Sequence, residues 1–210
     1  MKNQRSALNR QSFSLNSRNL LLSVLAAFLT AIFLPPTLQQ KGIAITASIP
    51  TYYIYVGYTL IATVGMVVMN FLGKKLPILW QLAKFGLVGV LNTAIDFGIL
   101  NFLSVLTSAT AGTALIPIKI GSFSVALVNS YFWNKGWVFE GKKRASPVTF
   151  AIVSALGIII NVGTVYALTT IIEAPGNISP SLWLNVANVG ATGLSMVWNY
   201  LGYRLVVFKK

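Results

Sequence analysis

The sequence contains no cysteine and no histidine, and only three of its 210 residues are acidic. Without cysteine there is no disulfide framework, and cysteine usage says nothing about the compartment. With only Asp96, Glu140 and Glu173 as acids, a metal site built from protein side chains is not expected. The same shortage argues against hydrolysis or group transfer by paired acids and bases. We therefore expect a protein that is not an enzyme and that uses no metal or cofactor.

Long apolar segments are what the sequence has instead. The chain is 55% hydrophobic and 9% charged, whereas about a quarter of the residues in a soluble domain are charged. Most of the apolar segments are long enough to cross a hydrocarbon core of roughly 30 Å as helices. The six segments cover residues 19–34, 51–73, 83–105, 112–134, 148–172 and 182–203. This pattern predicts an all-α polytopic membrane protein with about six transmembrane helices.

The cations predict the orientation of these helices. Of the 16 Lys and Arg residues, all except Lys41 and Lys119 fall on one side of the predicted segments. Because Lys and Arg collect on the cytoplasmic side, we expect both termini to be cytoplasmic and the protein to lie in the plasma (inner) membrane. The net charge of +13 is then explained by orientation and anionic lipid, or by an acidic cytoplasmic partner, and not by nucleic-acid binding.

Residues 1–34 have two interpretations. A basic start followed by an apolar core is typical of an export signal, but it is also typical of a retained first helix. We favour the retained helix, because cleavage would leave the next helix without its hairpin partner. Pro35-Pro36 are expected to end this first, short helix.

An internal repeat organises the rest of the chain. Phe85–Gly98 aligns with Phe150–Gly163, and in the helices that follow, Lys135 aligns with Arg204. Each copy is a two-helix hairpin that enters and leaves on the cytoplasmic side, so we expect parallel repeats and not inverted ones.

The N-terminal hairpin is less clearly related to this repeat. Val68–Leu76 resembles Val197–Leu205, either as a degenerate third copy or by chance similarity between apolar helix ends. The stretch that follows, Leu76–Ala83, is expected at the inner membrane interface, where Trp80 is well placed.

Asp96 is the acidic residue that falls within an apolar segment. It lies roughly 18 Å beyond Lys84 along a helix rising 1.5 Å per residue, in the outer half of the membrane. Lys119 enters the next helix from the outer side and should reach a similar depth. Charges in hydrocarbon are tolerated when paired, so we expect an Asp96–Lys119 ion pair.

The repeat aligns Asp96 with Asn161 and Lys119 with Asn188. If the hairpins face each other, these four residues and Asn92 form one polar patch. Such a patch is either a substrate pathway or a structural clamp, because amides and ion pairs also hold membrane helices together.

A second group of candidates lies at the inner interface, where amides, aromatics and cations recur in register. Lys and Arg at this level suit a lipid phosphate, and Trp and Tyr suit the headgroup zone. An aromatic belt with positive-inside anchoring is the alternative explanation. The candidates for lipid-phosphate binding are Lys75, Tyr131, Asn134, Lys135, Trp137, Asn199, Tyr200 and Arg204.

These motifs together resemble the GtrA-like family of small polytopic membrane proteins. The resemblance rests on Lys84–Phe97, on Val128–Phe139, on the helix from Phe150 and on the ending Asn199-Tyr200 with Phe208. It divides the chain into residues 80–210, a GtrA-like four-helix transmembrane domain, and residues 1–79, an N-terminal extension with two transmembrane helices.

The resemblance implies the flipping of polyprenyl-phosphate-linked monosaccharides for cell-surface polysaccharide or O-antigen glycosylation, beside a separate membrane glycosyltransferase. A distant likeness to the small third subunit of dolichol-phosphate-mannose synthase implies an alternative, a scaffold that anchors such a glycosyltransferase. A third hypothesis, a small proton-coupled cation exporter, comes from the single intramembrane carboxylate. The sequence has no P-loop for nucleotide-driven transport, and its thin bundle makes a homo-oligomer plausible.

Overall fold

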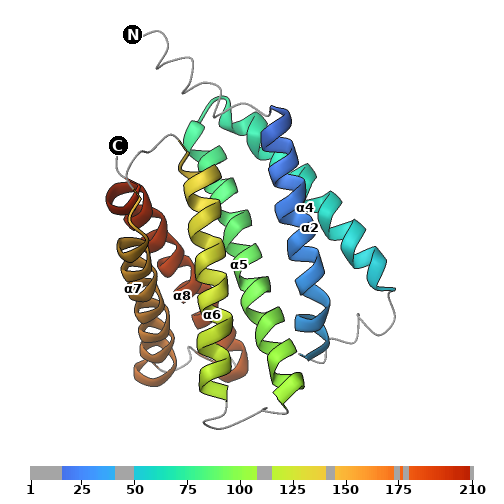
Figure 1. Cartoon of the computed structure of the whole chain (residues 1–210). Coiled ribbons are helices and arrows are strands. Elements are labelled where there is room, and N and C mark those ends of the chain that lie inside the picture. The colour runs from blue at the N-terminus through green and yellow to red at the C-terminus, as the bar shows by residue number, and fades with distance from the viewer. Residues whose placement is uncertain are drawn as a thin grey trace. The chain divides into compact units, whose positions relative to one another are not determined.

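The computed structural model describes residues 16–40, 50–107, 115–140, 145–172, 176 and 180–208, and every regular element among them is a helix. The α-helices are α2 (Ser17–Gln40), α4 (Thr51–Gly73), α5 (Pro77–Thr107), α6 (Leu115–Trp133), α7 (Pro147–Tyr166) and α8 (Pro180–Gly202) (Figure 1). Three π-helical turns follow α6, α7 and α8: η2 (Asn134–Val138), η3 (Ala167–Ile171) and η4 (Tyr203–Val207). The all-α prediction is confirmed.

Three of the described helices are long and apolar enough to cross a membrane: Thr51–Gly73, Pro77–Thr107 and the Pro147–Thr164 part of α7. A shorter apolar helix covers Ser17–Phe33. In hydrocarbon no water can satisfy backbone N–H and C=O groups, so a helix, which satisfies them within one segment, is the expected form. The chain is a polytopic membrane protein, and six spans remain a prediction.

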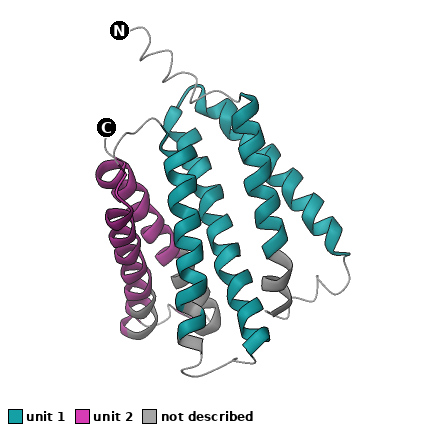
Figure 2. Cartoon of the chain, in the orientation of Figure 1, with its two compact units in different colours: residues 1–140 teal, residues 141–210 magenta. Residues whose placement is uncertain are grey.

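The chain divides into two compact units, Met1–Glu140 and Gly141–Lys210 (Figure 2). In the first unit α5 packs against α2, α4 and α6, and in the second α7 packs against α8. The predicted extension, residues 1–79, therefore belongs to the same compact unit as the first hairpin of the GtrA-like region.

Small residues on α2 allow close packing within the first unit. Ala26, Ala27 and Ala31 are fully buried, as expected where membrane helices approach closely. The buried hydroxyls of Ser23 and Thr30 donate to carbonyls one turn earlier in the same helix, each at 2.8 Å. Thus α2 presents an interior face without leaving these polar groups unsatisfied.

The expectation that Pro35-Pro36 end the first helix is wrong, because α2 continues through both prolines to Gln40. The proline ring fixes φ near −65°, which is a helical value. Two consecutive prolines therefore remove two backbone donors without forbidding helical dihedral angles. Transmembrane helices accommodate such losses more readily than soluble helices do.

Trp80, which is expected at the inner membrane interface, is packed inside the protein. Residues 77–83 are the first turns of α5, and the Trp80 side chain is completely buried. Gly73, the last residue of α4, makes this possible, since a Cβ there would lie 2.6 Å from Trp80 Cβ and 3.3 Å from its backbone nitrogen. The tight connection between α4 and α5 thus depends on a residue without a side chain.

Replacing Gly73 by Ala is expected to destabilise the first unit by about 1–3 kcal/mol, the usual result of overpacking. The obstacle is the backbone and Cβ of Trp80, which cannot rotate away. Gly65→Ala, in the same helix, is the matched control, because a Cβ at Gly65 meets nothing within 4 Å. Unfolding in a detergent titration should separate the two variants, and equal stability would contradict the packing argument.

The two hairpins, each taken separately, close in the same way at the ends that are predicted to be cytoplasmic. The rings of Phe85 and Phe139 lie 6.3 Å apart at 64°, and those of Phe150 and Phe208 lie 6.1 Å apart at 66°. Phe85 aligns with Phe150 and Phe139 with Phe208, and a π-helical turn precedes the second ring in both hairpins. The packing supports the sequence alignment; the parallel direction of the hairpins stays a prediction.

Candidate functional site

An amide pair joins the two helices of the first hairpin. Asn129 Nδ2 on α6 donates to Asn92 Oδ1 on α5 at 2.7 Å, and Trp133 Nε1 donates to Asn129 Oδ1 at 3.1 Å. Both asparagines are half-buried. Since Trp133 occupies one lone pair of the Asn129 oxygen, it holds that amide with its nitrogen toward Asn92.

Asp96 lies one turn beyond Asn92 on α5 and is half-buried. Its Oδ1 accepts a hydrogen bond at 2.7 Å from Ser122 Oγ on α6. Ser122 is fully buried, so this bond is an interior contact between the two helices. The amide pair and this bond form a polar seam, which we define as Asn92, Asp96, Ser122 and Asn129.

The predicted Asp96–Lys119 ion pair lies outside the described residues, because the Lys119 side chain is not among them. The same is true of the Asn188 side chain. Asn161 is half-buried in α7, within the second unit. Of the predicted pathway, the first hairpin therefore brings together Asn92 and Asp96, and convergence with the second hairpin remains a proposal.

The seam includes two residues that the sequence analysis did not single out for this role. Ser122 and Asn129 are seven residues apart on α6, a spacing that puts them on one helix face. Asn92 and Asp96, four apart on α5, share a face in the same way. These spacings indicate a polar face on each helix, but they do not show which serine of α6 meets the carboxylate.

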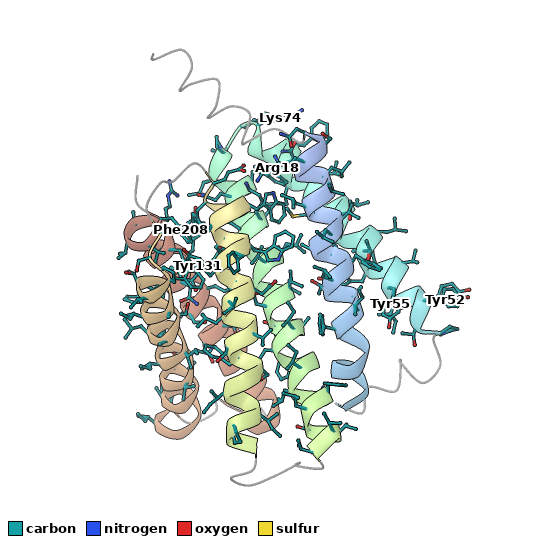
Figure 3. The ribbon with its side chains drawn as sticks, viewed as in Figure 1. Arg18, Tyr52, Tyr55, Lys74, Tyr131 and Phe208 are labelled. Atoms are coloured by element: carbon teal, nitrogen blue, oxygen red, sulfur yellow. The ribbon has the colours of Figure 1, made fainter. Side chains whose placement is uncertain are left out.

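A cation lies over an aromatic ring at the predicted inner end of each hairpin. Lys135 Nζ is 5.4 Å from the ring centre of Tyr131, and the Arg204 guanidinium is 5.8 Å from that of Tyr200. Arg204 also donates to the Tyr200 hydroxyl at 3.0 Å. These positions align in the repeat, and stacking of this kind holds the cations in place. Figure 3 labels Tyr131 in the first hairpin.

The other predicted phosphate-binding residues are placed unequally. Lys75 and Lys135 are exposed, and Asn199 is half-buried. Asn134 and Trp137, expected in the headgroup zone, are instead buried, each about 1% exposed. They are buried because η2 packs against α5 and α2, which cover the face of η2 that carries both residues. Their burial favours a role in holding the turn, and not direct contact with lipid.

Lys84 is the least expected feature of this end of the unit. It is one of the cations that the sequence places at the predicted cytoplasmic side, but it is only 3% exposed. Its Nζ donates to the Trp137 carbonyl at 2.8 Å and lies 3.8 Å from Glu140 Oε1. The same ammonium lies 5.6 Å from the ring centre of Trp80 and 5.7 Å from that of Trp137. A buried cation is thus enclosed by a carboxylate, a carbonyl and two indole rings.

Helix α2 contributes the remaining partners. Arg18 forms an ion pair with Glu140, and its Nη2 donates to the Gly136 carbonyl at 2.8 Å. Trp137 Nε1 donates to Asn19 Oδ1 at 2.9 Å. In Figure 3 Arg18 lies at the end of the first unit where Lys74 also lies, opposite Tyr52. We call Arg18, Asn19, Lys84, Trp137 and Glu140 the inner charge cluster.

Glu140 is the residue from which the inner charge cluster could have been predicted. It is one of only three acids in the chain and stands among the cations of the predicted inner side. An acid in that position indicates a buried cation partner, although the sequence does not show which of the nearby cations is buried.

Apolar helices joined by interior polar contacts define this chain as a multi-pass membrane protein. It belongs to the GtrA/DPMS transmembrane domain family, whose model matches residues 84–208. The chain is similar to the uncharacterized membrane protein YngA of Bacillus subtilis (strain 168), with 31% identity over 127 residues that cover 60% of this chain and 78% of YngA. No solved structure matches. The family match begins at Lys84, so Arg18 and Asn19 lie outside it.

Proposed function

We propose that this protein moves polyprenyl-phosphate-linked monosaccharides across the membrane for cell-surface polysaccharide or O-antigen glycosylation. GtrA-family proteins are implicated in the translocation of lipid-linked sugars. The observation that carries the proposal is the polar seam, in which Asp96 and Asn92 on α5 meet hydrogen-bonding partners on α6 within a predominantly apolar hairpin.

In this proposal the side chains of the polar seam replace the hydrogen bonds that water makes with the sugar. Sugar hydroxyls that enter hydrocarbon without partners lose several kcal/mol of hydrogen bonding, and amides and a carboxylate can supply both donors and acceptors. The phosphate is held at the inner side by Lys135 and Arg204, with Lys75 as a third cation, and the prenyl tail stays in lipid. Asn161, Asn188 and Lys119 complete the pathway. Exchange is passive, and consumption of the sugar on the outer side gives it direction.

Purified protein in liposomes tests the proposal. The probe is a short-chain polyprenyl phosphate bearing glucose, with mannose and N-acetylglucosamine lipids run in parallel. An oxidant that does not cross membranes reports the fraction in the outer leaflet. We expect equilibration at least about tenfold faster than in protein-free liposomes, the factor given by 1.4 kcal/mol of barrier lowering. If none of the three lipids equilibrates faster with the protein than in protein-free liposomes, the transport function is refuted.

A second candidate is a scaffold that positions a membrane glycosyltransferase. Its support is the exposure of Lys74, Lys75 and Lys135, whose charges are accessible to an acidic cytoplasmic partner. A scaffold would tolerate joint replacement of Asp96 and Lys119 but would lose its partner when these exposed cations are neutralised. Transport predicts instead that joint replacement of Asp96 and Lys119 slows lipid movement in liposomes that contain no partner protein.

A further inference from the structure

The end of η2 is held by side chains from two other helices. The carbonyls of Gly136, Trp137 and Val138 accept hydrogen bonds at 2.8, 2.8 and 3.1 Å from Arg18, Lys84 and Gln81, respectively. The final carbonyls of a helix have no partner within the helix. Three consecutive ones are satisfied here from outside, and two of the donors are cations, which also suit the negative end of a helix.

Helix α2 makes three polar contacts with this segment. Arg18 binds a carbonyl and the Glu140 carboxylate at once, and Asn19 accepts the indole N–H of Trp137. Asn19 and Trp137 are each only 1% exposed, so their bond is a specific interior contact. All three contacts end within residues 136–140.

The second hairpin does not repeat this arrangement in its sequence. Thr149 stands at the position aligned with Lys84, and Lys209 at the position aligned with Glu140. The ion pair between Lys84 and Glu140 therefore has no sequence counterpart there. The first hairpin is distinguished by a cluster that α2, from outside the family region, completes.

We propose that α2 is a positioning element for the inner turn of the first hairpin. Arg18 and Asn19 fix η2, and η2 carries Lys135, which is exposed and immediately precedes Gly136 and Trp137, the residues they hold. The N-terminal hairpin thereby sets how this cation is presented to a lipid phosphate. The role of Lys135 rests on the proposed function, whereas the fixing of the turn does not.

Hydrogen exchange in lipid nanodiscs tests the fixing of the turn. Arg18→Gln keeps a polar side chain but removes the charge, and exchange of the amides of residues 134–140 should become about three- to tenfold faster, as expected for a charge-assisted bond at a partly exposed site. Arg18→Lys should recover part of the protection, because lysine keeps the charge but not the fork geometry. Lys74→Gln is the control, since Lys74 is an exposed cation at the same end.

Binding of a short-chain polyprenyl phosphate without sugar tests the presentation of Lys135. We expect Arg18→Gln to weaken binding about three- to tenfold and Lys74→Gln to change it less than about twofold. Unchanged exchange in Arg18→Gln overturns the positioning role, and faster exchange with unchanged binding overturns its link to Lys135. If the wild-type protein fails in the liposome assay while Arg18→Gln loosens the turn, the proposed function fails and the positioning of the turn stands.

Discussion

Replacing Glu140 by Gln is expected to lower the free energy of unfolding of the first unit by about 2–4 kcal/mol. Glutamine keeps the size of the side chain and removes its charge, which leaves the ammonium of Lys84, 3% exposed, without its carboxylate. Removing one member of a buried ion pair is far more destabilising than removing a surface charge, because the remaining charge is kept from water. The Glu140 side chain is 18% exposed, which keeps the expected effect below the largest known values.

The double variant Glu140→Gln with Lys84→Met separates this mechanism from general disruption. Removing both charges should recover at least half of the loss, since the buried cation is gone as well. Lys74→Met, at an exposed cation, should change stability by less than about 0.5 kcal/mol. Unfolding by titration with a denaturing detergent measures the wild-type protein, the two single variants, the double variant and Lys74→Met. A double variant as unstable as the sum of its two single variants would show that the charges are not coupled.

The helical architecture was largely predictable from the sequence. The segment expected over 51–73 coincides with α4, and that expected over 83–105 lies within α5. Apolar stretches of this length have few alternatives to a helix in hydrocarbon, because every backbone polar group must be satisfied internally. For the same reason the prolines of α2 were misleading, since rules for helix ends come mainly from water-exposed helices.

The burial of Lys84 was not predictable in the same way. A cation beside an apolar segment can reach the headgroups or turn into the protein, and hydropathy is the same in both cases. The outcome depends on tertiary partners that are distant in sequence, since the Trp137 carbonyl that accepts from Lys84 lies 53 positions away. Trp80 follows the same logic, since its burial depends on the close approach allowed by Gly73.

The candidate pathway was only partly predictable from the sequence. Asn92 and Asp96 were predicted to share a helix face, and the structure brings that face against α6. Ser122 was missed because a serine in an apolar helix commonly bonds its own backbone, as Ser124 does with the Ile120 carbonyl. Only the facing of the two helices shows which serine meets the carboxylate.

Asp96→Ala is expected to slow the movement of lipid-linked sugar about ten- to a hundredfold. A hydrogen bond to a charged group contributes roughly 1.5–3 kcal/mol, and each 1.4 kcal/mol of lost stabilisation at the barrier corresponds to about a factor of ten in rate. Thr93→Ala is the matched control on the same helix. Thr93 is exposed and its hydroxyl donates to the Gly89 carbonyl at 3.0 Å, so its loss should leave transport within about twofold of wild type.

Asp96→Asn then separates a pathway from a clamp. An amide oxygen can still accept the hydrogen bond from Ser122, and the aligned residue Asn161 shows that the repeat itself uses an amide at this register. Helix packing should therefore survive the change, and unfolding in a detergent titration should confirm this. If the carboxylate acts on the sugar, the liposome rate still falls about tenfold, because an amide accepts weaker hydrogen bonds than a carboxylate does. Wild-type rates in a stable Asp96→Asn protein would assign the charge no part in transport and leave Asp96 as a contact between α5 and α6.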